Sequence, residues 1–256
     1  VLKFNLDRKA QRVRVFELGR VFLRDASVAN TDTTVEGFHQ PMRVAGVAYG
    51  ANDVLQWGRK EQGIDFFDVK GDVEAMLAPL RATFEPGTHP AMHPGRCARV
   101  LMNGKLIGHV GELHPQWRQS WELPQAPVLF ELELDAVLQR TVPQFKAVAK
   151  HQAVERDLAI VVAERVTHSE VMAAVESAVP ASLLRSAVLF DVYRPKAVRP
   201  GEEPAAGGAV AAGEKSLAVR LTLGSDEASL TEAEIEAAVQ AVVTQLVART
   251  GGRLRV

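Results

Sequence analysis

The sequence has little cysteine, little net charge and no long apolar run. One cysteine, Cys97, among 256 residues excludes an internal disulfide and any zinc site built from several cysteines. Lys and Arg number 30 against 31 Asp and Glu, for a formal net charge of −1. That balance argues against a strongly basic protein that binds nucleic acid without regard to sequence, but it allows a local basic patch. No apolar run approaches the roughly 18 residues of a membrane-spanning helix.

The composition is that of a folded globular protein. Hydrophobic residues make up 47% and charged residues 24%, which is enough apolar material for a buried core. At about 150 residues per domain, the length predicts one large domain or two ordinary ones. We expect a soluble, cytoplasmic protein without a membrane partner. Because the chain begins Val1-Leu2-Lys3, without an initiator Met or a signal peptide, we also expect it to be a piece of a longer protein.

Residues 1–143 are predicted to form a mixed α+β domain. The strongest local signal is Asn103-Gly104, which is typical of a tight hairpin between two strands. Apolar residues at three- and four-residue steps predict a helix, with Asp68 or Asp72 near its start. Residues 25–40 are polar and are predicted to be a loop. The predicted strands are 12–24, 42–49, 97–103, 106–113 and 127–134, and the predicted helices are 66–82 and 115–121.

Residues 144–256 are predicted to form a ferredoxin-like βαββαβ sandwich, with two helices on one face of a four-stranded antiparallel sheet. Both helices begin with a Thr followed by Glu three residues later, at Thr167 and Thr231, which is a capping box. The predicted strands are 157–163, 185–193, 215–223 and 253–256, and the predicted helices are 168–179 and 232–249.

Side-chain alternation predicts which face of this sheet meets the helices. The residues expected in the core are Leu158, Ile160, Val162, Val188, Phe190, Val192, Leu217, Val219, Leu221 and Leu223. The residues expected on the opposite face are Asp157, Asp191, Tyr193, Arg220, Thr222, Arg253 and Arg255. RNA-recognition modules of this topology stack bases on aromatic residues of the two central strands. The outward positions expected on those strands are Ala159, Val161, Ala218 and Arg220, so an ordinary module of that type is not predicted.

Seven sequence blocks occur in one order along the chain. They are VFELGRVF (15–22), FDVKGDVEAML (67–77), HPGRCARV (93–100), IGHVGELHP (107–115), RDLAIVV (156–162), LFDVYRPK (189–196) and GEKSLAVRLTL (213–223). Together they resemble the C-terminal portion of the bacterial phenylalanyl-tRNA synthetase beta subunit. The resemblance implies a partial class II synthetase-like antiparallel sheet with helices, which has lost catalysis, followed by a ferredoxin-fold anticodon-binding domain.

The resemblance also implies partners and chemistry. In that family the beta subunit pairs with a catalytic alpha subunit, and an (αβ)₂ tetramer attaches phenylalanine to its tRNA. ATP and Mg²⁺ belong to the alpha subunit, so no catalytic residue and no cofactor are expected in this chain. The GxGxxxR block of an ATP-binding class II site is missing, which agrees with this. The family pattern SxFPxxRRD is altered at 151–155, while Arg156 and Asp157 fit it. Residues 195–213 are predicted to be a flexible insertion.

Six residues are candidates for contact with tRNA: Arg156, Tyr193, Arg194, Lys196, Lys215 and Arg220. Arginine and lysine neutralise phosphates, and Tyr193 offers a ring on which a base stacks, worth about 1–3 kcal/mol. The alternative is that these are solvated surface residues. Basic and acidic residues nearly balance in 144–256, so binding must come from a local cluster rather than from a bulk positive field.

Four histidines, His89, His93, His109 and His114, invite a metal hypothesis. Proline follows two of them, and no acidic or cysteine partner lies at a convincing spacing. We therefore predict no metal site, and expect turns in which these histidines make local hydrogen bonds. Cys97 begins an apolar strand without an activating neighbour, so a small buried residue is predicted rather than a nucleophile.

Five aromatic residues of the first domain remain: Phe38, Trp57, Phe66, Phe67 and Trp117. An amino-acid pocket is one interpretation, but packing in the core or at a subunit interface is favoured, because large aromatics dominate both. The rival to tRNA binding is a protein-interaction scaffold whose ferredoxin-like domain does not contact RNA. A stand-alone enzyme has no motif to support it.

Overall fold

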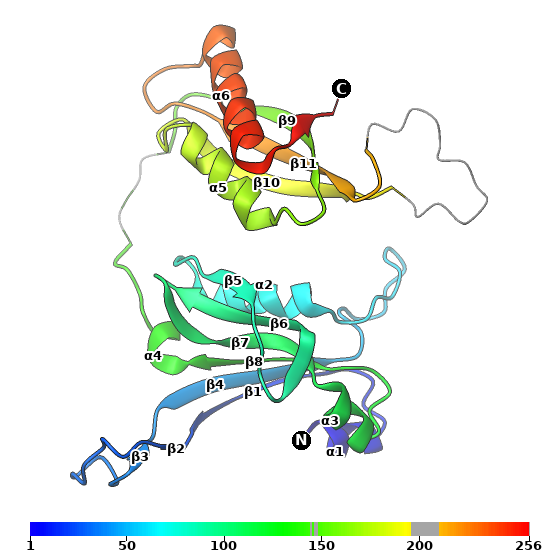
Figure 1. Cartoon of the computed structure of the whole chain (residues 1–256), viewed down its shortest axis with the longest axis vertical. Coiled ribbons are helices and arrows are strands. Elements are labelled where there is room, and N and C mark those ends of the chain that lie inside the picture. Colours follow the sequence, from blue (N-terminus) through cyan, green and yellow to red (C-terminus); the bar gives the residue numbers. More distant parts are fainter. Residues whose placement is uncertain (144, 146–147, 196–209, 256) are drawn as a thin grey trace. The chain divides into compact units, whose positions relative to one another are not determined.

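The chain folds into two compact units, Val1–Gln144 and Phe145–Val256 (Figure 1). The structure is a computed structural model that describes every residue except 144, 146–147, 196–209 and 256. The expected insertion at 195–213 and the candidate Lys196 therefore fall largely or wholly outside the described residues. Within the described part, none of the helices combines the length and the apolar character needed to span a bilayer.

The first unit is built on a six-stranded antiparallel sheet in the order β1-β4-β8-β7-β6-β5. Its strands are β1 (Val13–Arg20), β4 (Met42–Tyr49), β5 (Thr83–Pro86), β6 (Met92–Met102), β7 (Lys105–Leu113) and β8 (Val128–Glu133). A separate pair consists of β2 (Leu23–Arg24) and β3 (Phe38–His39), and the helices are α1 (Leu2–Asp7), α2 (Phe66–Leu77), α3 (Pro115–Ser120) and α4 (Leu134–Val137). One face of the sheet packs against α2, whose Val69, Val73 and Leu77 are buried with Val110 and Leu132 of the sheet.

Local sequence signals explain two of these elements. Asn103 and Gly104 have φ angles of +52° and +77°, the left-handed conformation that a tight hairpin turn between β6 and β7 requires. The cap of helix α2 lies earlier than the sequence indicates. Asp65 accepts hydrogen bonds from the backbone N–H groups of Phe67 and Asp68, and Asp68 completes the capping box. The helix ends at Leu77 rather than at residue 82, because Pro79 removes a helical hydrogen-bond donor.

The segment 12–24, which the sequence predicts as one strand, forms two. Strand β1 ends at Arg20, and after Val21 and Phe22 the chain continues as β2, which pairs with β3 rather than with the large sheet. Most of the predicted loop 25–40 is irregular, but its last residues form β3. The predicted strand 127–134 is present as β8, in which Val128, Phe130 and Leu132 are buried.

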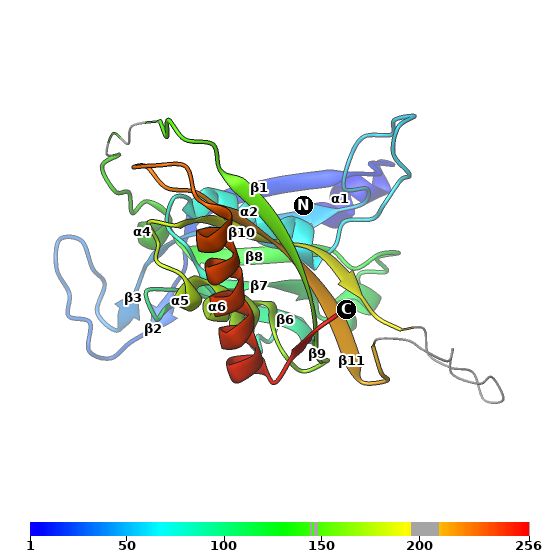
Figure 2. The same cartoon turned by 90° about the horizontal axis from the view of Figure 1, so that it is seen from above.

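The second unit has the predicted βαββαβ order, and its sheet has the strand order β10-β11-β9-β12. Its elements are β9 (Val154–Ala163), α5 (His168–Ala178), β10 (Leu184–Tyr193), β11 (Glu214–Leu223), α6 (Glu232–Thr250) and β12 (Arg253–Leu254). Both helices lie on the same face of the sheet (Figures 1 and 2), where they bury Val171, Val175, Val242 and Leu246 against β9 and β11. The capping boxes at Thr167 and Thr231 are both present.

The predicted core face of β10 is wrong. Val188 and Phe190 are more than half exposed, and Val192 is also exposed, whereas Ala187 and Leu189 pack against the core. Two features cause the error. One alternating set of β10 contains Val188, Phe190 and Val192, and the other contains Ala187 and Leu189 beside charged residues, so apolar residues occur in both sets and the larger apolar set is not the buried one. In addition, the pairing of β10 with β11 shifts between Leu184 and Ser186 and again between Leu189 and Asp191, and such bulges change which residues face the core. Between the two shifts Val188 pairs with Arg220, which places it on the side away from the helices. The core residues predicted on β9 and β11 are all buried.

Candidate nucleic-acid interface

The face of the four-stranded sheet that α5 and α6 leave uncovered carries an arginine near its centre. Arg220 lies on β11 between the buried Val219 and Leu221, so its side chain points away from the helices. Its Nε and Nη2 atoms donate hydrogen bonds of 2.8 Å each to the two carboxylate oxygens of Asp157 on β9. Glu155 lies 3.5 Å from the same guanidinium. The hydrogen bonds from Arg220 hold the pKa of the Asp157 carboxyl below its ordinary value, and Asp157 raises the pKa of Arg220.

Two aromatic rings of β10 lie beside arginines on this uncovered face. The guanidinium carbon of Arg220 is 5.2 Å from the centre of the Phe190 ring, and that of Arg255 is 5.1 Å from the centre of the Tyr193 ring. Both distances are within the range of a cation–π contact. Phe190 is 52% exposed and Tyr193 45% exposed, so each pair offers flat surface to solvent. Unpaired bases stack on such aromatic and guanidinium planes.

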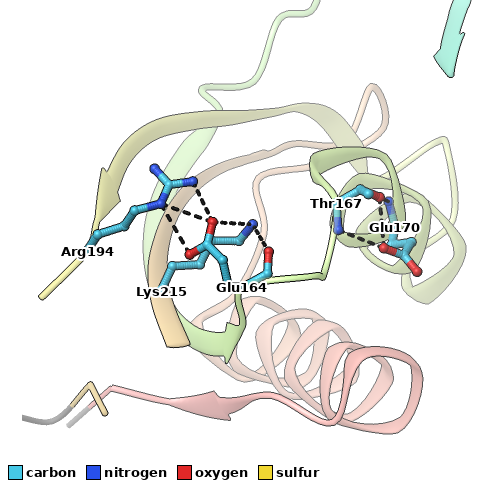
Figure 3. A network of polar contacts seen from close by, with 5 residues as sticks. All are labelled: Glu164, Thr167, Glu170, Arg194 and Lys215. Carbon is cyan, nitrogen blue, oxygen red and sulfur yellow. Dashed lines mark hydrogen bonds and ion pairs between the residues drawn. The ribbon is translucent and has the colours of Figure 1, made fainter. Parts of the chain in front are cut away.

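Arg194, Glu164 and Lys215 form a polar cluster where β10 ends and β9 turns toward α5 (Figure 3). Arg194 donates to both carboxylate oxygens of Glu164, at 2.8 to 3.2 Å, and these bonds lower the pKa of that carboxyl. The Lys215 ammonium donates to the Glu164 backbone carbonyl at 2.7 Å and lies 3.7 Å from its carboxylate. Lys215 is only 8% exposed, so its ammonium mainly holds the chain turn in place.

Arg156 lies on the other side of the sheet. It pairs in register with the fully buried Leu221, which places it on the side that the helices cover. There its Nη2 atom donates to Glu232, in the first turn of α6, at 2.8 Å. The structure therefore does not bring the described candidates together in one place. Arg220 and Tyr193 lie on the uncovered face, Arg194 and Lys215 form a separate ion-paired cluster, and Arg156 contacts α6.

Sequence reasoning misses two residues of the uncovered face as contact candidates. It assigns Phe190 to the core, and it places Arg255 on this face without selecting it. Alternation alone does not reveal Phe190, because the side of β10 that faces the core is set by its pairing with β11, in which Val188 lies opposite Arg220. The local signal is the presence of apolar residues in both alternating sets of β10, which is typical of an edge strand with an apolar outer surface.

Strand β12 is held against this sheet by charge. Arg253 donates to both carboxylate oxygens of Glu214 on β11, and the Ala211 backbone N–H donates to the same carboxylate at 2.9 Å. These bonds, those from Arg253 first, lower the pKa of Glu214 to about 2. Only two residues of β12 pair with β9, so the ion pair keeps the segment that carries Arg255 against the sheet.

Three of the four histidines make the local hydrogen bonds that the sequence predicts, whereas His109 lies within strand β7. The Nδ1 atoms of His89, His93 and His114 accept from the backbone N–H two residues later, at 3.0 to 3.2 Å. The His89 and His109 rings lie 5.1 Å apart, and burial, followed by the charge of His89, lowers the pKa of His109. Among the described residues no group of three or more potential metal ligands gathers. Cys97 is buried as predicted, and burial raises its pKa.

Most of the five aromatic residues singled out in the first unit are exposed rather than buried in its core. Phe66 packs against the core cluster, but Phe67 is 73% exposed and Trp57 is fully exposed, at 102%. Phe38 and Trp117 are each 39% exposed. The prediction of core packing is therefore wrong for Trp57 and Phe67, and packing at a subunit interface stays a prediction.

Two family models match the chain. The model described as phenylalanyl tRNA synthetase beta chain CLM domain matches residues 1–134, and the ferredoxin-fold anticodon binding domain matches residues 149–255. Similar curated proteins are phenylalanine–tRNA ligase beta subunits. That of Cupriavidus pinatubonensis is 47% identical over 99% of this chain, and that of Ralstonia nicotianae is 46% identical over 99%. The chain spans 31% of the length of each. Among solved structures, a pyrrolysyl tRNA synthetase from Desulfitobacterium hafniense covers 54% of this chain and 44% of its own, with a TM-score of 0.34 and 12% identity, too low a likeness to support an inference.

Proposed function

This chain belongs to the phenylalanyl-tRNA synthetase beta-chain family, as its seven sequence blocks predict, and we propose that its second unit binds tRNA through the uncovered sheet face. Under this proposal the chain is part of the non-catalytic beta subunit of a phenylalanine–tRNA ligase. The first unit supports assembly with the catalytic alpha subunit in an (αβ)₂ tetramer. The alpha subunit supplies the ATP- and Mg²⁺-dependent chemistry, and the enzyme works in the cytoplasm.

The observation that carries the proposal is the pairing of aromatic rings with arginines on that face. Phe190 lies beside Arg220 and Tyr193 beside Arg255, on a domain that matches the anticodon-binding family model. Each pair offers a plane for a base and a cation for a phosphate. Asp157 offers carboxylate oxygens that accept hydrogen bonds from base amino groups. The surface therefore suits an unpaired RNA segment better than a duplex, whose bases are stacked on one another.

The other residues that the sequence suggests as tRNA contacts are weaker candidates than Arg220 and Tyr193. Arg194 and Lys215 lie at a strand end and are held by Glu164, so a phosphate would have to replace a carboxylate. Arg156 would reach RNA only past the N-terminal turn of α6, where Glu232 now binds it. Lys196 lies outside the described residues.

The test is binding of the full chain to phenylalanine tRNA at two salt concentrations, compared with the same tRNA carrying a changed anticodon. We expect binding that depends on the anticodon and weakens as salt rises. Tyr193→Ala should weaken it about 5- to 150-fold, because a stacked base is worth about 1–3 kcal/mol. Arg220→Ala should weaken binding and reduce its salt dependence.

Arg249→Ala is the matched control, because it removes the same charge from the last turn of α6, on the side of the sheet away from the proposed face. Its affinity should equal that of the wild type. The proposal is wrong if Tyr193→Ala and Arg220→Ala bind as tightly as Arg249→Ala. Equal binding of both tRNAs by the chain assembled with the alpha subunit would favour a protein-interaction scaffold instead.

A further inference from the structure

The carboxylate of Glu164 joins the ends of three neighbouring strands of the second unit. Arg194 directly follows the edge strand β10, Lys215 lies on β11, and Glu164 directly follows β9. Because β11 lies between β10 and β9 in the sheet, the bonds from Arg194 to Glu164 cross it beside Lys215 (Figure 3). We call these three residues the strand-end clamp. It ties the end of β10 to a strand with which β10 does not pair.

The Glu164 side of the strand-end clamp is held firmly by the backbone. The Glu164 N–H donates to the Gly213 carbonyl at 2.8 Å, and the Glu164 carbonyl accepts from the Lys215 ammonium at 2.7 Å. In the same turn the Val166 N–H donates to the Ala163 carbonyl at 3.0 Å. Glu164 is therefore a fixed point to which the Arg194 side chain is attached.

The end of β10 has few other interactions that hold it in place. The pairing of β10 with β11 shifts between Leu189 and Asp191, and the described pairs beyond the shift are those of Asp191, Val192 and Tyr193. In the described sheet β10 pairs on one side only. Val192 is 39% exposed and Tyr193 45%, so burial contributes little here. The ends of such strands open more easily than the core of a fold, and the strand-end clamp opposes that opening.

Tyr193 is the residue that directly precedes Arg194. Successive side chains of a strand point to opposite faces, so Arg194 reaches Glu164 while the Tyr193 ring lies beside Arg255 on the uncovered face. If the end of β10 opens, the Tyr193 ring moves away from Arg255 and no longer offers a fixed plane. A ligand that stacks on this ring then binds only the closed fraction of the molecules, and its apparent affinity falls by that fraction.

We propose that Glu164 and Arg194 are positioning residues for tRNA binding, which keep the end of β10 closed and so hold the Tyr193 ring in place for an unpaired base. The inference rests on the proposed function, which supplies the RNA and the stacking role of Tyr193. It gives Arg194 a role other than a phosphate contact, because the Glu164 carboxylate stays bonded to Arg194 when RNA is bound. The two roles predict opposite effects of removing the Glu164 charge.

The first test is binding of the full chain to phenylalanine tRNA. Arg194→Ala should weaken binding about 5-fold, the upper end of the range for an exposed ion pair, because this contact is bidentate and belongs to a network. The slope of log affinity against log salt should not change, whereas loss of a phosphate contact would lower it by about 0.7. Glu164→Gln should also weaken binding, whereas it should tighten binding if Glu164 merely competes with a phosphate.

A double substitution shows whether the strand-end clamp acts through the Tyr193 ring. Added to Tyr193→Ala, Arg194→Ala should cause no further loss of affinity, because the ring that it positions is already gone. Arg194→Lys should recover part of the affinity that Arg194→Ala loses, since it keeps one ionic bond to Glu164.

Asp226→Ala is the matched control for the loss of an ion pair from β10. Arg185, near the other end of this strand, donates to the two carboxylate oxygens of Asp226 at 2.7 and 3.3 Å. The control therefore removes a bidentate arginine–carboxylate pair from the same strand without disturbing Tyr193. Its affinity for tRNA should equal that of the wild type.

The second test needs no RNA. The chain has two tyrosines, Tyr49 and Tyr193, and Tyr49 is buried in the first unit. In the full chain with isotope-labelled tyrosine rings, the NMR signals of Tyr193 should shift in Arg194→Ala and in Glu164→Gln. They should keep their wild-type positions in Asp226→Ala, and the Tyr49 signals should not move in any variant. Unmoved Tyr193 signals in both clamp variants would overturn the inference whatever the tRNA data show.

The two tests separate failure of the inference from failure of the proposed function. If Tyr193→Ala weakens tRNA binding but Arg194→Ala and Glu164→Gln do not, the inference is wrong and the proposed function survives. A lower salt slope in Arg194→Ala, or tighter binding by Glu164→Gln, would also overturn the inference and assign Arg194 to a phosphate. If Tyr193→Ala binds tRNA as tightly as the wild type, the stacking role fails and the inference fails with it.

Discussion

Three glycine-to-alanine substitutions in the first unit should differ in their effect on stability, according to the atoms that the added methyl group would contact. At Gly108 on β7 the φ angle is +157°, and a Cβ would lie 2.0 Å from the Glu131 carbonyl oxygen and 2.8 Å from the Leu132 Cα. Both atoms belong to the backbone of β8, so relief requires the two strands to separate. At Gly104 the φ angle is +77° but nothing lies within 4 Å. Gly71, inside α2, has open space and no positive φ.

The expected changes in the free energy of unfolding follow from these contacts. Gly108→Ala should cost about 3 kcal/mol or more, because overpacking here forces the backbone of a central strand pair apart. Gly104→Ala should cost about 1 kcal/mol, the cost of the left-handed conformation for a residue with a Cβ. Gly71→Ala should stabilise by about 0.5–1 kcal/mol, since alanine loses less entropy in a helix.

Urea unfolding followed by tryptophan fluorescence measures these changes. All three tryptophans, Trp57, Trp117 and Trp121, lie in the first unit, so the signal reports on that unit alone. The comparison requires that the free energy of unfolding falls with urea concentration at the same slope in all variants. If Gly108→Ala unfolds within 1 kcal/mol of Gly104→Ala, the close approach of β7 to β8 does not limit the side chain there, and the reasoning is refuted.

Two further predictions concern the second unit. Leu246→Ala should destabilise this unit by about 2–5 kcal/mol, because Leu246 is fully buried against the sheet and the substitution would leave a cavity. The rate of amide hydrogen exchange in β11 measures this loss of stability. An unchanged rate would contradict the inferred contribution of Leu246 to the core. The pKa of Glu214 is about 2 in the folded chain, against an ordinary value of 4.5 for a glutamate in water. The ion pair between Glu214 and Arg253 therefore contributes fully to the stability of the folded chain above pH 4.5, and this contribution is lost as the pH falls through 2. Glu214→Gln should remove this part of the pH dependence of stability. The measurement is the difference in thermal midpoint between the variant and the wild type, which should shrink from pH 5 to pH 2. A difference that stays constant over this pH range would disprove the prediction.

The elements that the sequence predicts well are those determined by neighbouring residues. The capping boxes at Thr167 and Thr231 and the hairpin at Asn103-Gly104 depend on contacts within four positions, and all three are present. Helix α2 shows the limit of such signals. The sequence suggests Asp68 or Asp72 near the start of this helix, whereas the hydrogen bonds of the folded chain show that Asp65 is the cap.

The candidate site depends on distant pairings, which no local pattern contains. Arg156 and Arg220 both lie near aspartate or glutamate residues in space, but strand register sends Arg156 to the helix side and Arg220 to the uncovered side. The partner of Arg194 is Glu164, thirty positions away. Phe190 lies on the uncovered face because β10 pairs with β11 so that Val188, two residues earlier, is opposite Arg220. The composition of the site was predictable, whereas its geometry required the fold.

The arginines of the uncovered face carry their own counterions. Asp157 and Glu214 occupy Arg220 and Arg253 when no RNA is present, in the way that dissolved anions surround an ordinary basic surface. A phosphate that binds such an arginine displaces a carboxylate that stays attached to the protein. The freed carboxylate takes up a cation from solution, and this uptake offsets part of the cation release from the RNA. The affinity should then fall less steeply with salt than the roughly 0.7 logarithmic units per contact typical of single strands. If the uncovered face binds RNA as proposed, a polyanion without unpaired bases gains little from this exchange. An RNA that also stacks its bases on Phe190 and Tyr193 would bind more tightly, so the ion pairs would favour unpaired RNA over other polyanions.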